Sequence, residues 1–104
     1  MSQFDVFDNV VKASRDVFPL VVELQSDISA SGPNRLIAYL TPAALHAPAA
    51  NYVVPGVEVD GTGYLLVLPT LTNVPVSSLR SVRGNIGPYR DTIVRGIDWL
   101  FCGI

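Results

Sequence analysis

The stretch GVEVDGTGYLLVLP, residues 56–69, predicts a β-hairpin and with it a sheet-based fold. Its Asp60-Gly61 pair is a dipeptide that favours a tight turn between antiparallel strands. Gly63, just after the turn, gives the second strand the freedom for a bulge. We therefore expect antiparallel pairing in this part of the chain.

The chain before the hairpin predicts more strands. FPLVVELQ (18–25) and RLIAYL (35–40) have the alternating pattern of half-buried strands, and QFDVF (3–7) is a further short strand. On one face of these strands we expect Leu20, Val22, Leu24, Leu36, Ala38 and Leu40, and on the other Val21, Glu23, Gln25, Ile37 and Tyr39. SGPN (31–34) is the turn between the two longer strands.

Two segments predict helices. In TPAALHA (41–47), Thr41 is a plausible N-cap and Pro42 takes the first helical position. A longer helix begins at Pro88 and carries an apolar stripe of Tyr89, Ile93, Val94, Ile97, Leu100, Phe101 and Ile104. Gly96 is unfavourable inside a helix, which indicates a close approach by another segment, and Gly103 ends the helix. The fold class is therefore α+β with a mainly antiparallel sheet.

Composition favours a single domain, residues 1–104, that associates with itself. Of the 104 residues, 49% are apolar and 15% are charged, so some apolar surface is left for an interface. No apolar run is long enough for a membrane span, and acids stand where a signal peptide has basic residues. Cys102 is the only cysteine, which excludes an internal disulfide and fits the cytoplasm.

Charge and residue chemistry favour a binding protein over an enzyme. The net charge of −2 gives no reason to expect nucleic-acid binding, although four of the seven basic residues follow residue 75 and suit an acidic partner segment or a solvated helix face. No phosphate-binding loop, metal-ligand spacing or cofactor motif is present. A nucleophile pair of Cys102 with His46 is conceivable, but no third group is visible to orient it. An acid–base pair of Asp27 with Arg35 is also conceivable, but many other pairs could be chosen equally well.

The last nine residues, GIDWLFCGI (96–104), are almost wholly apolar. A chain end is normally polar and loosely held. This one is therefore expected to pack either into the core or against another molecule.

Four stretches together resemble the CcdB family of toxins. VELQSDI (22–28) is similar to the family's VDVQSDI, NVPVSSL (73–79) to its SVPVS segment and DWLFCGI (98–104) to its NLMFWGI, while QFDVF matches its first strand. The resemblance implies a twisted, mainly antiparallel sheet of the SH3-like barrel type with a small side sheet and a C-terminal helix. The MazF and Kid ribonucleases share this fold.

The resemblance also implies a function. CcdB toxins are cytoplasmic homodimers made beside an antitoxin with a disordered C-terminal segment. They are not enzymes and need no cofactor, but bind the A subunit of DNA gyrase and trap the enzyme on cleaved DNA. The alternatives are a ribonuclease toxin and a non-toxic descendant that keeps only the dimer and antitoxin binding.

Carried over by position, the gyrase-binding residues are Ile28, Ser29, Asp98, Phe101, Cys102, Gly103 and Ile104. Ser29 and Asp98 replace an isoleucine and an asparagine, and Cys102 replaces a tryptophan that stacks on a gyrase arginine. Trp99, one helical turn earlier, is added as a candidate replacement for that ring. The alternative is that Trp99 packs under the sheet. With Cys102 in place of the tryptophan, the expected poisoning is weak.

Overall fold

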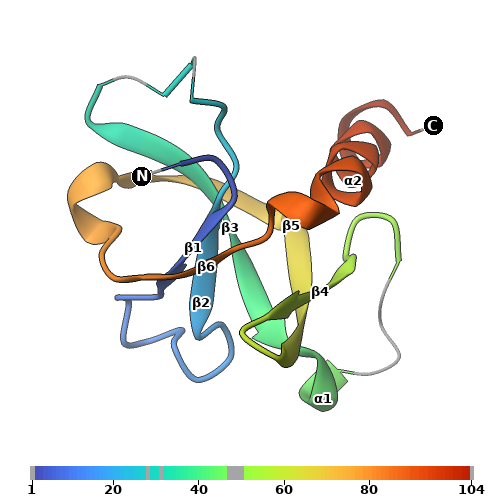
Figure 1. Cartoon of the computed structure of the whole chain (residues 1–104), viewed down its shortest axis with the longest axis horizontal. Coiled ribbons are helices and arrows are strands. Elements are labelled where there is room, and N and C mark those ends of the chain that lie inside the picture. The colour runs from blue at the N-terminus through green and yellow to red at the C-terminus, as the bar shows by residue number, and fades with distance from the viewer. Residues whose placement is uncertain (1, 28, 31, 47–50, 104) are drawn as a thin grey trace.

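A computed structural model describes residues 2–27, 29–30, 32–46 and 51–103. Its six strands form one antiparallel sheet in the order β4-β5-β3-β2-β1-β6 (Figure 1). The strands are β1 (Asp5–Asp8), β2 (Leu20–Glu23), β3 (Asn34–Pro42), β4 (Gly56–Val59), β5 (Thr62–Pro75) and β6 (Val82–Asn85). The edge strands β4 and β6 also contact each other, so the sheet curls almost into a barrel. The α+β class is confirmed, but all described strands belong to one sheet, without a separate side sheet.

The helices are α1 (Ala43–His46) and α2 (Arg90–Cys102), and the short 3₁₀ turns are η1 (Val76–Ser78) and η2 (Gly87–Tyr89). Neither α-helix in the described part of the chain is long and apolar enough to span a membrane. Thr41 is not the cap of α1, because it belongs to β3 and its hydroxyl donates to the carbonyl of Val17 at 2.7 Å.

The predicted hairpin joins β4 to β5. Val59 pairs with Thr62, so Asp60 and Gly61 form a two-residue turn, and both have positive φ angles, 52° and 82°. A two-residue turn with two positive φ angles matches the right-handed twist of the two strands that it joins. The bulge expected at Gly63 is absent, since Gly63 pairs regularly with Glu58.

The register of the sheet shifts instead at two other places, between β1 and β6 and between β3 and β5. In the second pair the register shifts between Ile37 and Tyr39. There the amide of Tyr39 donates to the hydroxyl of Thr70, which donates in turn to the carbonyl of Val67. A side chain thus replaces one carbonyl of the ladder.

Both faces of the central strands are buried. The larger core lies on one face and includes Val6, Val22, Ala38, Leu40, Leu66 and Ile93. A second, smaller core on the other face consists of Phe7, Val21, Ile37 and Leu79, with Tyr39 and Val74 packed against it. The prediction that these strands are half-buried is therefore wrong, because the segment after β5 brings Leu79 back over their second face.

The predicted long helix is confirmed, as are the close approach at Gly96 and the end of the helix at Gly103. Ile93 and Gly96 are buried on its inner side. A Cβ atom on Gly96 would lie 2.4 Å from the carbonyl oxygen of Tyr52 and 2.5 Å from Cδ1 of Leu68. Gly103 ends the helix with a φ of 74°, and its amide donates to the carbonyl of Trp99 at 3.1 Å.

Glu23, in strand β2, carries a buried carboxyl group. Its side chain is buried and its Oε1 atom has no hydrogen-bond partner. Burial raises the pKa of Glu23 above the ordinary 4.5; Arg35 opposes this rise, while Asp5 and Asp27 add to it. The folded protein therefore holds this proton to a higher pH than the unfolded chain does.

We accordingly expect the free energy of unfolding to fall as the pH rises from 4.5 through the raised pKa of Glu23, since ionising the buried group costs stability. Urea unfolding at several pH values measures this slope. Glu23→Gln cannot ionise and should flatten it, whereas Glu58→Gln, at an exposed position, should leave it unchanged. Equal slopes in wild type and Glu23→Gln would contradict the assignment.

Candidate functional site

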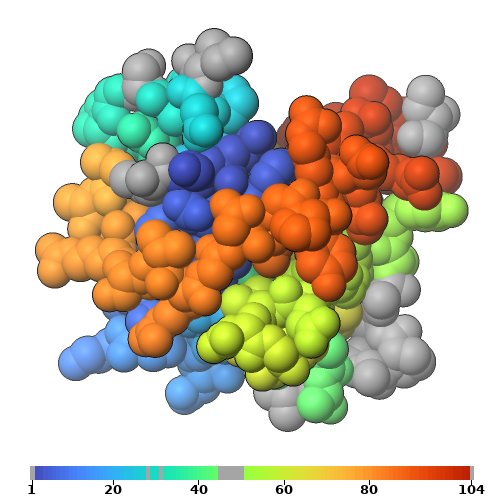
Figure 2. Space-filling model, viewed as in Figure 1, coloured from blue at the N-terminus to red at the C-terminus, as the bar shows by residue number. Residues whose placement is uncertain are grey.

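The last turns of α2 form an exposed, partly apolar surface. Asp98, Trp99, Phe101, Cys102 and Gly103 are all exposed, and Phe101 is the most open large apolar side chain of the described residues, at 67%. We call these five residues the α2 end. Figures 1 and 2 show the C-terminal part of α2 at one corner of the molecule. Ile104 and Ile28 lie outside the described residues.

The α2 end is exposed because its side chains lie away from the face of α2 that packs on the larger core. Ile93 and Gly96 are buried, and Ile97 and Leu100 are half-buried against the larger core. Phe101, predicted to continue the same apolar stripe, instead points to solvent. Leu100 therefore packs against the core of its own chain, whereas the residues of the α2 end do not.

Trp99 lies on the side of α2 and stacks on Tyr52. The two ring centroids are 4.8 Å apart and the ring planes differ by 5°. Trp99 is 39% exposed, so the alternative that it packs under the sheet is wrong. The role of Tyr52 was not predicted, since nothing in its neighbourhood marks it as a partner of a residue far along the chain.

Ser29 lies in the loop between β2 and β3, where it is exposed and hydrogen-bonded within the loop. Its amide and hydroxyl bond to Ser26, and its carbonyl accepts from the side chain of Gln25 at 2.8 Å. In Figure 1 this loop and the α2 end lie at the same end of the molecule but well apart. One chain therefore does not bring Ser29 and the α2 end together.

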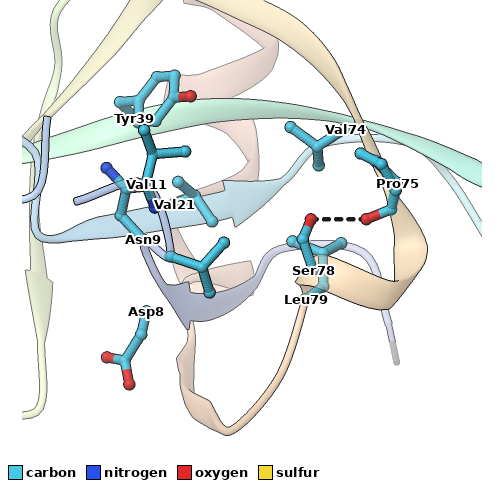
Figure 3. A pocket seen from close by; sticks show the side chains of 10 residues that line it. Asp8, Asn9, Val11, Val21, Tyr39, Val74, Pro75, Ser78 and Leu79 are labelled. Atoms are coloured by element: carbon cyan, nitrogen blue, oxygen red, sulfur yellow. Dashed lines mark hydrogen bonds between the residues drawn. The ribbon is translucent and has the colours of Figure 1, made fainter. Parts of the chain in front are cut away.

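On the smaller core, a cavity of about 170 Å³ opens between β1 and η1 (Figure 3). Its lining is largely apolar and includes Val10, Val11, Val21, Tyr39, Val74 and Leu79. The hydroxyl of Ser78, also in the lining, donates to the carbonyl of Pro75 at 2.7 Å. No base contacts that hydroxyl within the described part of the chain, so the cavity offers apolar contacts rather than a nucleophile.

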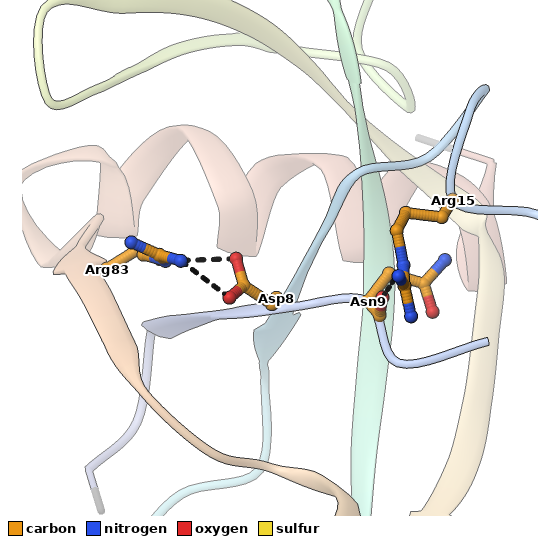
Figure 4. Close-up of polar contacts among 4 residues, drawn as sticks. All are labelled: Asp8, Asn9, Arg15 and Arg83. Atoms are coloured by element: carbon orange, nitrogen blue, oxygen red, sulfur yellow. Dashed lines mark hydrogen bonds and ion pairs between the residues drawn. The ribbon is translucent and has the colours of Figure 1, made fainter. Parts of the chain in front are cut away.

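Two arginines bind Asp8 and Asn9, which belong to the lining of this cavity (Figure 4). Arg83 donates two hydrogen bonds to Asp8, at 2.9 and 2.7 Å, and lowers the pKa of Asp8. Arg15 donates to the carbonyls of Asn9 and Val10 and so closes the loop after β1. Both guanidinium groups are thus engaged in holding the fold.

Comparison with known families assigns the chain. It matches the family model of the CcdB protein over residues 3–103, nearly its whole length. The chain belongs to the CcdB family. No curated protein matches it at a significant level. Membership of the CcdB family suggests a toxin of a toxin–antitoxin system.

The pairs considered for catalysis are not assembled in this member of the CcdB family. Asp27 accepts from the amide of Gln3, and Arg35 donates to the carbonyls of Gly32 and Asn34. α1, which carries His46, lies far from the end of α2, which carries Cys102 (Figure 1). Among the described residues, no group of three or more His, Cys, Asp or Glu is placed to hold a metal ion.

Proposed function

We propose that this CcdB-family protein is a cytoplasmic toxin that binds the A subunit of DNA gyrase through the α2 end and inhibits or poisons the enzyme. The observation that supports the proposal is that Trp99, Phe101 and Cys102 are all exposed in the last turns of a helix whose inner face is already buried. Exposed aromatic side chains on a rigid element are typical anchors of protein interfaces. The toxin acts by binding and not as an enzyme.

Two experiments test the proposal. Purified protein is incubated with gyrase, and both its binding to the gyrase A subunit and the amount of cleaved DNA complex are measured; induced expression is scored for growth arrest. Phe101→Ala should reduce binding, while Val82→Ala, which shortens another exposed apolar side chain on β6, should not. RNA cleavage without gyrase binding would indicate a ribonuclease instead, and normal growth would indicate a non-toxic descendant.

We further propose that the protein is a homodimer. Ser29 and the α2 end lie apart in one chain, and a second copy is the simplest way to bring both onto one face. Exposed apolar residues such as Leu36 and Val94 add surface for such an interface. Sedimentation at micromolar concentration is expected to give twice the mass of one chain, and a clean monomer would contradict the dimer.

The second proposed partner is an antitoxin whose C-terminal segment is disordered when free. Such segments fold on binding and cover large surfaces. A synthetic peptide of that segment, taken from the reading frame beside the gene, should raise the melting temperature of the toxin. At a hundredfold excess over Kd the expected stabilisation is about 2.7 kcal/mol. A melting temperature that stays unchanged as the peptide concentration is raised would show that this segment does not bind the toxin.

A further inference from the structure

Tyr52 sits at the tip of a tight turn that the backbone holds on both sides. The amides of Asn51 and Val54 donate to each other's carbonyls, at 3.0 and 3.2 Å. The side-chain oxygen of Asn51 accepts from the amides of Val53 and Val54, both at 2.9 Å. A turn closed in this way leaves the backbone of Tyr52 little freedom.

The turn is fixed to two other elements. The carbonyls of Val53 and Pro55 accept from Leu68 and Leu66 of β5, at 3.1 and 2.9 Å. On the other side the carbonyl of Tyr52 lies against Gly96 of α2, where a Cβ atom would be 2.4 Å away. Tyr52 is thus carried by a turn that is hydrogen-bonded to β5 and packed against α2.

From this support the ring of Tyr52 stacks on Trp99, one helical turn beyond Gly96. The rings are nearly parallel and cover one face of each other, yet Tyr52 remains 55% exposed and Trp99 39%. An offset stack of two rings is favoured by its electrostatics as well as by contact area. The indole of Trp99 is therefore held at one orientation at the surface, in the last turns of α2.

We propose that Tyr52 is a positioning residue of the gyrase-binding surface, because it fixes the indole of Trp99 before the partner arrives. This inference rests on the proposed function. Ordering a free side chain on binding costs affinity, and a side chain that is already ordered avoids this cost. Tyr52 thereby keeps one aromatic ring of the α2 end in a fixed place at the surface.

The test compares Tyr52→Leu with Tyr52→Phe. Leucine removes the stacked ring, so Kd for the A subunit of gyrase should rise about three- to tenfold, the cost of ordering one large side chain. Phenylalanine keeps the ring and should stay within about twofold of wild type. Trp99 is the only tryptophan, so 5-fluorotryptophan labelling gives one ¹⁹F resonance, whose width and position report the mobility of the indole.

The outcomes separate this inference from the proposed function. If the wild-type protein does not bind gyrase, both the proposed function and the positioning role of Tyr52 are wrong. Wild-type affinity in Tyr52→Leu, or an unchanged ¹⁹F resonance in that variant, overturns only the role of Tyr52, as does an equal loss in Tyr52→Phe. If Tyr52→Leu does not fold, the labelled wild type decides: its resonance must shift when gyrase binds, and no shift overturns the inference.

Discussion

Replacing Gly96 by alanine should lower the free energy of unfolding by about 1–3 kcal/mol, the usual cost of forcing a side chain into a filled space. The new Cβ atom would lie 2.4 Å from the carbonyl oxygen of Tyr52 and 2.5 Å from Leu68. Leu68 is buried, and the carbonyl belongs to the turn that β5 holds. Neither neighbour can move without loss elsewhere.

Helix propensity acts in the opposite direction, since alanine is favoured over glycine by about 1 kcal/mol inside a helix. The steric term should still win, because the nearer of the two neighbours is a backbone carbonyl held by the turn and not the end of a flexible side chain. Thermal and urea unfolding measure the difference, with Arg95→Ala as the control on the exposed side of the same helix. A more stable Gly96→Ala would mean that the Tyr52 turn moves aside easily.

Local patterns predicted those elements whose cause is local. The Asp60-Gly61 turn, the course of α2 and the αL glycine at 103 each follow from a few neighbouring residues. Even the close approach at Gly96 was indicated, because glycine is otherwise costly in a helix. The residue that approaches Gly96 was not, since nothing near Tyr52 in the sequence points to α2.

The predictions that were wrong depend on distant segments. Val21 and Ile37 are buried because Leu79, far along the chain, covers them, so alternation within one strand does not reveal the second core. The hydroxyl of Thr41 donates a hydrogen bond to the carbonyl of Val17 and does not cap the helix that follows. At the candidate site, the position of α2 was predicted, but the exposure of Phe101 depends on which side of the helix the sheet covers, since Leu100 in the same turn is packed on the core.

Gyrase binding should respond most strongly to a tryptophan at position 102. Cys102 is exposed, so Cys102→Trp adds a ring to the α2 end without filling occupied space. A ring stacked on an arginine contributes about 0.5–2 kcal/mol. We expect roughly two- to thirtyfold tighter binding and a matching increase in trapped cleavage complexes, provided that the surface meets gyrase as proposed.

Cys102→Leu is the matched control, because it adds apolar area without an aromatic face. Equal gains for leucine and tryptophan would show that the gyrase affinity of the wild type is limited by apolar area alone.

Trp99→Ala is the third variant to compare. Since Trp99 is stacked at the surface and not buried, this variant should lose only about 1 kcal/mol of stability and remain folded. It should nevertheless bind gyrase more weakly. If wild type poisons gyrase strongly and Trp99→Ala does so equally, no aromatic ring is needed at either position, and the binding energy must come from Phe101 and its other neighbours.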